Sequence, residues 1–234
     1  MTRVGSETAD HPVSAVIFDL DGTLVDSYEA ITACFNHARA QLGFPPITEG
    51  EVRPMVGYGL EALMERAVGE DRMAEGVRLF RAHYDTICEA RTRVLPGVVE
   101  TLAELHRRGF LLGVATNKPV RFARRLLCAL GLMPPVAAVR GPGGDIPAKP
   151  HPSMLSAVLV DLGVKRHASV YVGDMGVDVE TARRAGLRVC LVPTGSASRP
   201  EVVAAGADHV LERFDDLPAL VSSSDWSLSA RGRA

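Results

Sequence analysis

Hydrophobic and polar positions follow a different pattern in each of three parts of the 234-residue chain. Residues 13–19 form a short apolar run that ends in an aspartate, which predicts a buried strand. In residues 27–94 apolar side chains recur three or four positions apart, so helices are predicted there and no strand. From residue 95 to residue 221, helical segments closed by glycine alternate with short apolar runs. That alternation is typical of a parallel sheet with helices on both faces.

The period of the apolar residues and the positions of glycine and proline set the predicted boundaries. In the middle part, helices are expected at residues 28–38, 49–55, 60–68 and 72–91. After residue 95, strands are expected at residues 110–115, 136–139, 169–172, 188–192 and 209–211, and helices at residues 98–108, 120–130, 154–162, 179–185 and 217–221. We therefore predict a doubly wound, Rossmann-like α/β core, residues 13–26 and 95–221, with an inserted helical domain at residues 27–94. A flexible leader, residues 1–12, and a disordered tail, residues 222–234, are expected at the ends.

Composition narrows the class of protein. The chain is 47% hydrophobic and 23% charged, with a formal net charge of −2, which suits a globular protein and argues against nucleic acid as its main partner. No apolar run reaches the roughly 18 residues that a membrane span requires. The four cysteines are scattered without a CxxC pair, so reduced, buried thiols are expected. We predict a cytoplasmic monomer or homodimer that binds neither nucleic acid nor membrane.

Two aspartates end the first predicted strand. Asp19 and Asp21 are two residues apart, so on a strand both side chains point to one face. Carboxylates that close repel each other unless a proton or a metal ion lies with them. Taken alone, these residues fit a plain strand, turn and helix cap equally well, because Asp, Gly and Thr are ordinary turn residues. The ends of the other strands decide between the two interpretations.

Polar residues also follow three later predicted strands. They are Thr116, Asn117 and Lys118 after residues 110–115, Lys149 in the Gly- and Pro-rich loop after residues 136–139, and Asp174 and Asp178 after residues 169–172. Each has a plainer explanation: a helix N-cap for Thr116, a solvated loop lysine for Lys149, and acids favoured by a helix dipole for the two aspartates. Ligands of open α/β sheets bind at the carboxyl ends of the strands, so the whole set on one edge favours a site.

The same residues resemble the four motifs of the haloacid dehalogenase (HAD) superfamily. The motifs are Asp19-Leu20-Asp21-Gly22-Thr23, Thr116-Asn117, Lys149-Pro150, and Gly173-Asp174 with Asp178, in the superfamily's order. The helical segment after the first motif resembles the type-1 cap, and residues 53–66, 95–97 and 143–145 are similar to phosphoglycolate phosphatases. The resemblance covers about residues 13–221. It implies a Rossmann-like core with an inserted all-helical cap domain.

The resemblance also implies a role for each motif residue. Asp19 would be the nucleophile that forms an aspartyl-phosphate, and Asp21 would be the acid and base, with its rotamer held by Thr23. Lys149 would be a fixed positive charge beside Asp19 and the transferring group. Hydrogen bonds to the phosphoryl oxygens would come from Thr116 and Asn117.

A Mg²⁺ cofactor is implied as well, because a carboxylate that approaches a phosphoryl dianion needs cations nearby. The implied metal-binding residues are Asp19, Asp21 through its backbone carbonyl, Asp174, and Asp178 as a more distant or water-mediated partner. Met175 departs from the family, whose members commonly have a small hydroxyl residue at that position. The departure removes a possible hydrogen bond near the metal but no carboxylate.

The second aspartate separates branches of the superfamily. Dehalogenases and phosphonatases lack an acid there, so Asp21 favours hydrolysis of a phosphate monoester or phosphoryl transfer. We predict a Mg²⁺-dependent phosphatase, a phosphoric monoester hydrolase, that acts on a small phosphorylated metabolite, with 2-phosphoglycolate as the first candidate. A phosphosugar mutase of the β-phosphoglucomutase type and a non-catalytic binding or regulatory protein on the same scaffold are the alternatives. Arg53 and Gly57 are candidates for substrate contact in the cap, although a helix–helix turn with a solvated arginine explains them equally well.

Overall fold

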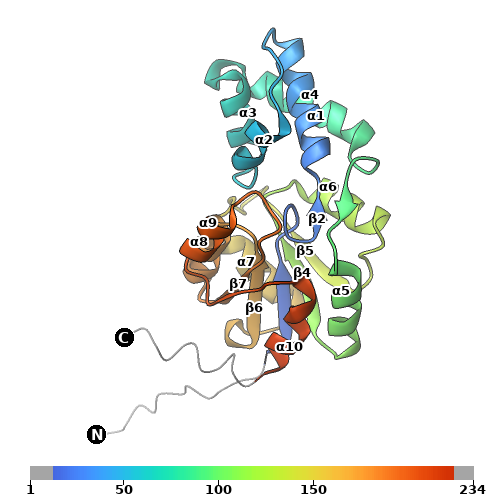
Figure 1. Cartoon of the computed structure of the whole chain (residues 1–234), viewed down its shortest axis with the longest axis vertical. Helices are drawn as coiled ribbons and strands as arrows, with labels where there is room; N and C mark the ends of the chain where they lie inside the picture. Colours follow the sequence, from blue (N-terminus) through green and yellow to red (C-terminus); the bar gives the residue numbers. More distant parts are fainter. Residues whose placement is uncertain (1–12, 224–234) are drawn as a thin grey trace, which may run out of the picture.

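The structure, a computed structural model, describes residues 13–223 (Figure 1). A six-stranded sheet flanked by helices makes up one part, and helices α1–α4 lie beyond one edge of it. The predicted leader, residues 1–12, lies outside the described residues. So does the predicted tail, residues 222–234, except that Ser222 is the last residue of α10 (Leu217–Ser222) and Ser223 follows it.

The sheet is parallel throughout, with the strand order β5-β4-β1-β6-β7-β8. Its strands are β1 (Ala15–Phe18), β4 (Leu111–Ala115), β5 (Val136–Arg140), β6 (Ser169–Gly173), β7 (Arg188–Leu191) and β8 (His209–Val210). Every residue of β1 is fully buried, as expected of a central strand that is covered on both faces. Phe18 lies opposite Val114 of β4 and Val172 of β6, so the chain leaves these three strands at the same level.

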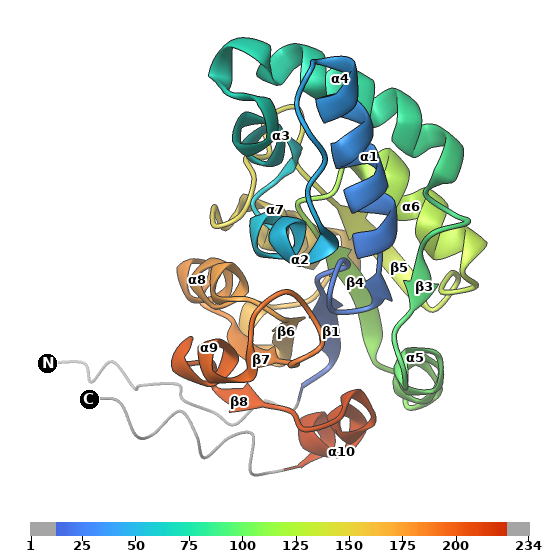
Figure 2. The ribbon, with the colours of Figure 1, turned by 45° about the horizontal axis from the view of Figure 1, so that its top comes forward.

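Helices cover both faces of the sheet, and the alternation of side chains along β1 explains why. Val16 and Phe18 pack on one face with α5 (Val98–Arg107), α6 (Val120–Ala129) and α10. Ile17 packs on the other face with α7 (Ser153–Leu162), α8 (Gly176–Ala185) and α9 (Arg199–Ala204). Figure 2 shows these two helical layers on opposite sides of the strands. The single-turn helices η2 (Arg166–Ala168) and η3 (Phe214–Asp216) lie in connections.

The second part is built from α1 (Tyr28–Gln41), α2 (Glu49–Val52), η1 (Arg53–Met55), α3 (Leu60–Val68) and α4 (Glu70–Ile87). These helices share a hydrophobic cluster of their own, which includes Phe35, Met64 and Phe80. Phe122 and Leu126 of α6 also belong to this cluster, so it is continuous with a helix of the sheet layer. A capping box between Thr48 and Glu51 begins α2.

The predicted fold class, a doubly wound α/β sheet with an inserted helical part, is confirmed. Besides the single-turn helices η2 and η3, three elements were not predicted. The strands β2 (Val25–Asp26) and β3 (Arg93–Val94) pair antiparallel where the chain leaves and re-enters the sheet layer, so the expectation of no strand within residues 27–94 is wrong at its end. Two residues are too few for an alternating pattern, and α9 is only six residues long.

Candidate active site

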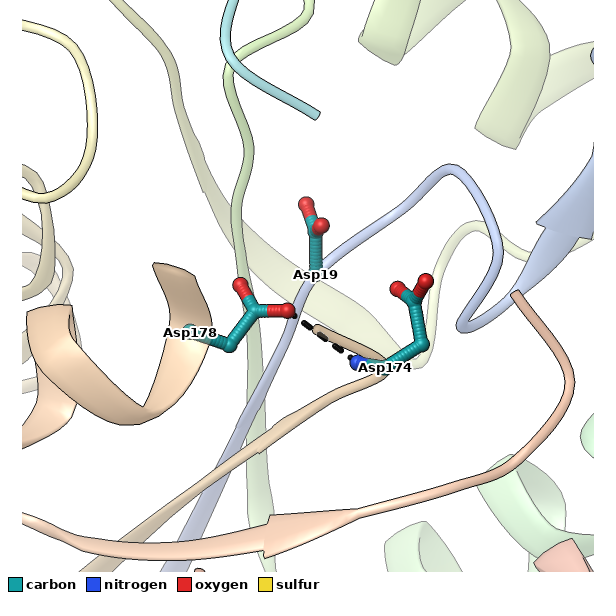
Figure 3. Close-up of side chains that lie close together, drawn as sticks. All are labelled: Asp19, Asp174 and Asp178. Carbon is teal, nitrogen blue, oxygen red and sulfur yellow. Dashed lines mark hydrogen bonds between the residues drawn. The ribbon is translucent and has the colours of Figure 1, made fainter. Parts of the chain in front are cut away.

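Three neighbouring strands bring their motif residues to one edge of the sheet. Asp19 follows β1, Thr116 follows β4 and Asp174 follows β6. Because the strands are parallel and in register, these residues leave the sheet at the same level, on either side of the point where the strand order reverses. Figure 3 shows Asp19 and Asp174 at this edge with Asp178, which comes from the first turn of α8.

Lys149 holds two of these carboxylates. Its ammonium group, which is fully buried, lies 2.8 Å from Asp19 Oδ2 and 2.8 Å from Asp178 Oδ1. The Tyr171 hydroxyl is 3.2 Å from the same nitrogen. Burial alone would lower the pKa of Lys149, but the charges of Asp178 and Asp19 more than offset it and raise the pKa above its ordinary value. Lys149 is therefore a fixed positive charge at this edge of the sheet.

Asp178 is fully occupied by protein donors. Its Oδ2 accepts hydrogen bonds from the backbone amides of Asp174, at 3.1 Å, and Met175, at 3.0 Å. Its Oδ1 accepts from Lys149, and the Tyr171 hydroxyl lies 3.1 Å away. A Cβ on Gly173 would lie 2.3 Å from the Asp178 carboxyl carbon, so this close approach requires glycine. Asp178 thus orients the loop after β6 and the Lys149 ammonium group. Because both of its oxygens already accept hydrogen bonds from the protein, it suits the indirect contact with a metal ion that the family resemblance implied.

Asp174 lies in a cradle of two glycines. Its Oδ1 accepts a 2.9 Å hydrogen bond from the Thr23 hydroxyl. A Cβ on Gly195 would lie 1.6 Å from its Oδ2, and a Cβ on Gly22, whose φ is +84°, would lie 2.6 Å from it. The expectation that Thr23 holds the rotamer of Asp21 is wrong, because its hydroxyl is bonded to Asp174 instead. Burial, together with the charges of Asp178 and Asp19, raises the pKa of Asp174 well above its ordinary value.

The loop after β7 was not included in the predicted site. Besides Gly195, it supplies Thr194, whose hydroxyl donates a 2.7 Å hydrogen bond to the carbonyl of Gly22. The available signal was the strand itself, since the rule that polar groups gather at the carboxyl ends of parallel strands applies to β7 as well. A glycine at such a strand end carries no chemistry, which is why the sequence alone did not single it out.

The acidic residues fit a divalent cation. Carboxylate oxygens of Asp19, Asp174 and Asp178 lie within 4.8 Å of one another. Asp19 Oδ1 and Asp174 Oδ2 are both buried and have no hydrogen-bond partner within the described residues. Burial raises the pKa of Asp19 to about 6, although the Lys149 charge acts in the opposite direction. A hard cation that prefers oxygen ligands, such as Mg²⁺, would satisfy the two unpaired oxygens and stabilise both carboxylates in their charged form.

Asp21 is held by two side chains. Lys118 donates to both of its carboxylate oxygens, over 2.8 and 2.7 Å, and the Ser27 hydroxyl lies 2.5 Å from its Oδ1. Lys118 is buried and its ammonium group also lies 5.0 Å from the centre of the Tyr84 ring. The sequence placed Lys118 at the end of a strand but assigned it no role. Its position two residues after Thr116 was the only signal, and a lysine there equally suits a solvated loop.

Thr116 and Asn117 are both buried. The Thr116 hydroxyl accepts a 3.2 Å hydrogen bond from the Lys118 amide. The Asn117 side chain accepts from the Lys149 amide, at 2.7 Å, and donates to the carbonyl of Gly57, at 2.9 Å. Asn117 therefore connects the helical part to the lysine loop, and donation from either residue to a phosphoryl group stays a prediction.

The two residues predicted for the cap lie in different surroundings. Gly57 lines a cavity between the strand edge and the helical part, whereas Arg53 does not line it. The Arg53 guanidinium lies over the Tyr28 ring, 4.0 Å from its centre, and pairs with Glu49 at 2.9 Å. Met175 lies against Gly57, where a Cβ would be 2.5 Å from its sulfur. The side chain that departs from the family pattern thus packs on the loop before α3.

Comparison with known proteins gives the context for this geometry. Residues 16–192 match the family model described as haloacid dehalogenase-like hydrolase. A phosphoglycolate phosphatase of Rhodospirillum rubrum is 40% identical, over 91% of this chain and 90% of that protein. A plasmid-encoded phosphoglycolate phosphatase of Cupriavidus necator is 36% identical, over 92% of this chain and 96% of its own length.

A solved structure has the same fold. The crystal structure of a predicted phosphoglycolate phosphatase from Haemophilus somnus superposes with a TM-score of 0.82 at 27% identity, and covers 91% of this chain and 99% of its own.

Across residues 13–223, no helix has both the length and the apolar composition needed to cross a membrane. The predicted enzyme class, a phosphoric monoester hydrolase, is confirmed by the family and its named relatives. The chain belongs to the haloacid dehalogenase-like hydrolase family, as its four motifs predicted.

Proposed function

We propose that the protein is a Mg²⁺-dependent phosphatase that hydrolyses 2-phosphoglycolate, a small phosphorylated metabolite, through an aspartyl-phosphate on Asp19. The observation that carries the proposal is the state of Asp19 itself. One carboxylate oxygen is bound to the Lys149 ammonium at 2.8 Å, while the other is buried and unpaired within the described residues. The substrate is inferred from relatives named phosphoglycolate phosphatase, which are 36–40% identical over about nine-tenths of the chain.

Asp19 acts as the nucleophile. Its carboxylate attacks phosphorus, the bond from phosphorus to the leaving oxygen breaks, and an acyl phosphate forms on the side chain. The positive charge of Lys149 reduces the repulsion between the carboxylate and the phosphoryl dianion, and it is held in place by Asp178 at 2.8 Å. Thr116 lines the same cavity as Asp19, which supports its assignment as a hydrogen-bond donor to a phosphoryl oxygen.

Asp21 acts as acid and then as base. In the first step it gives a proton to the leaving alkoxide oxygen, so that glycolate departs with a neutral hydroxyl group. In the second step it takes a proton from the water that attacks the acyl phosphate, which releases inorganic phosphate and restores Asp19. A positioned acid–base group of this kind contributes roughly 10²- to 10⁴-fold to the rate.

The Mg²⁺ would be held by Asp19, the backbone carbonyl of Asp21, and Asp174, with Asp178 behind them. It supplies positive charge to the phosphoryl oxygens when it is bound. The two unpaired buried oxygens, Asp19 Oδ1 and Asp174 Oδ2, support this assignment.

We also propose that residues 27–94 form a cap domain over a core of residues 13–26 and 95–221. The hydrophobic cluster built mainly from α1–α4 and the paired strands β2 and β3 support that division. Gly57 lines the cavity between the two parts, which supports contact of the cap with substrate, whereas Arg53 is engaged elsewhere. A cytoplasmic location and a monomeric or homodimeric state stay predictions.

A screen of phosphate release over a panel of phosphorylated metabolites, compared by kcat/KM, tests the function. We expect 2-phosphoglycolate to be the preferred substrate, turnover to require Mg²⁺, and Asp19→Asn to abolish it. Release of phosphate at the wild-type rate by Asp19→Asn would contradict the mechanism. A mutase would isomerise a sugar phosphate with a bisphosphate primer and release little phosphate, and a regulatory protein would turn over nothing on the panel.

A further inference from the structure

The cavity beside the strand edge has an uneven chemical character. Towards the helical part its wall is apolar, with side chains from Ile31, Val56, Leu60, Leu63 and Phe80. Towards the sheet it is polar, and Lys118 is the only cationic residue among the described residues that line it. A charged group that enters this cavity loses its water and must find an opposite charge, because burial of an unpaired ion is costly.

Lys118 has two neighbours that can accept its hydrogen bonds, Asp21 and the Tyr84 hydroxyl. An ammonium group carries three donors, and the hydrogen bonds to the two oxygens of Asp21 use two of them. The Tyr84 hydroxyl lies beside the same ammonium group and lines the same cavity. Tyr84 is 1% exposed, and its hydroxyl, which can only accept from the Lys118 ammonium, has no acceptor for its own proton among the described residues. A buried hydroxyl whose proton has no acceptor is rare in native proteins and indicates a missing acceptor.

The position of Lys118 relative to the proposed reaction indicates which acceptor is missing. Asp21 protonates the leaving oxygen, so the substrate atoms attached to that oxygen lie next to Asp21. The Lys118 ammonium group is 2.7 Å from Asp21 Oδ2, so these substrate atoms lie next to Lys118 as well. In 2-phosphoglycolate the carboxylate carbon is two bonds from the leaving oxygen. The carboxylate would therefore lie within reach of Lys118 and Tyr84.

We propose that Lys118 and the Tyr84 hydroxyl bind the carboxylate of the substrate, and that they select phosphate esters of 2-hydroxy acids over neutral phosphate esters. This inference rests on the proposed function. It gives Lys118 two tasks, to orient Asp21 and to recognise the substrate, and it assigns Tyr84 to recognition alone.

Two substrates that differ only in the carboxylate test the inference. Ethyl phosphate has the phosphate and the chain length of 2-phosphoglycolate but a methyl group in place of the carboxylate. The measured quantity is the ratio of kcat/KM for 2-phosphoglycolate to kcat/KM for ethyl phosphate, in the wild type and in variants. Removal of the Lys118 ammonium group also removes a hydrogen-bond partner of Asp21, which affects both substrates. Only a change in the ratio therefore reports recognition of the substrate carboxylate.

We expect Lys118→Met to lower the ratio by about 10- to 100-fold, since a hydrogen bond to a charged group is lost. Tyr84→Phe is expected to lower it by about 2- to 10-fold. Lys165→Met is the matched control, because Lys165 is exposed and outside the cavity, and its ratio should equal that of the wild type. Equal losses on both esters in Lys118→Met would overturn the proposal and leave Lys118 only the orientation of Asp21.

Product inhibition of the wild type gives a readout that does not depend on the folding of a variant. Glycolate carries the carboxylate and ethanol does not, so glycolate should inhibit at concentrations at least tenfold lower than ethanol, and inhibition no stronger than that of ethanol would overturn the proposal. Failure of the proposed function looks different. The wild type would then release no phosphate from 2-phosphoglycolate, whereas phosphate release with an unchanged ratio in the variants contradicts only the inference about Lys118 and Tyr84.

Discussion

Asp174 fits its place in the site because two neighbouring residues have no side chain. Its carboxylate lies against the backbone of Gly22 and Gly195, and a Cβ at either position would collide with its Oδ2. Gly22 also has a φ of +84°, which residues with a side chain rarely adopt. At this scale, the motif predicted Gly22 as part of the turn, but the need for Gly195 follows only from the approach of two loops that are distant in sequence.

Gly195→Ala should therefore lower kcat/KM by about 100-fold or more. The added Cβ would lie 1.6 Å from Asp174 Oδ2, so the carboxylate must move, and a misplacement of about 1 Å is enough for a loss of that size. Steady-state kinetics with the preferred substrate, together with the Mg²⁺ concentration needed for half-maximal activity, measure the effect. Gly50→Ala is the control, because a Cβ there meets nothing closer than 3.9 Å. Unchanged kinetics in Gly195→Ala would contradict the placement of Asp174.

Two kinds of contact join the helical part to the sheet layer. Asn117 connects the carbonyl of Gly57 to the backbone amide of Lys149 through one buried side chain. Farther from the site, Arg121 of α6 pairs with Asp85 of α4 at 2.8 Å on the surface. The two contacts contribute differently to the free energy of unfolding. A buried amide that loses its partner cannot form a hydrogen bond to water instead, whereas an exposed ion pair is screened by solvent.

Asn117→Ala should lower the free energy of unfolding by about 1–3 kcal/mol, because it leaves the buried Lys149 amide without its acceptor. It should also lower kcat, since the Lys149 loop loses the contact that positions it. Arg121→Ala is expected to change the free energy of unfolding by only about 0–1 kcal/mol, because both partners are more than a third exposed. Urea unfolding of both variants measures these free energies. Equal losses in the two variants would contradict the greater contribution assigned to Asn117.

At the scale of the whole molecule, the site keeps carboxylates buried although burial favours their neutral form. Burial raises the pKa of Asp19 to about 6 and that of Asp174 well above its ordinary value, and Lys149 offsets only part of this. Between about pH 4 and pH 6, the metal-free folded state thus holds more protons than the unfolded chain, so its stability falls as the pH rises through that range. A bound cation offsets the loss, which links metal binding to folding.

Mg²⁺ should consequently raise the Tm more at about pH 7.5 than at about pH 5. At the lower pH, a proton on Asp19, whose pKa burial raises to about 6, competes with the metal ion, while at the higher pH that carboxylate is charged and free to bind it. Thermal unfolding with and without millimolar Mg²⁺ at the two pH values provides the measurement. Asp174→Asn should remove the difference, and an equal rise in Tm at both pH values would contradict the link.

The local sequence determined the alternation of strands and helices, the parallel sheet, and the motif residues at the strand ends. A strand buried on both faces appears as an apolar run and a helix as a 3.6-residue period, and both patterns can be read from a short stretch of chain. It did not determine which partners those residues meet. Thr23 bonds to Asp174 and not to Asp21, Lys118 and Ser27 hold Asp21, and Asn117 bonds to Gly57. These contacts join residues up to 151 positions apart. Only the tertiary structure decides them, because the distance between two side chains from separate strands or domains depends on how every intervening element packs.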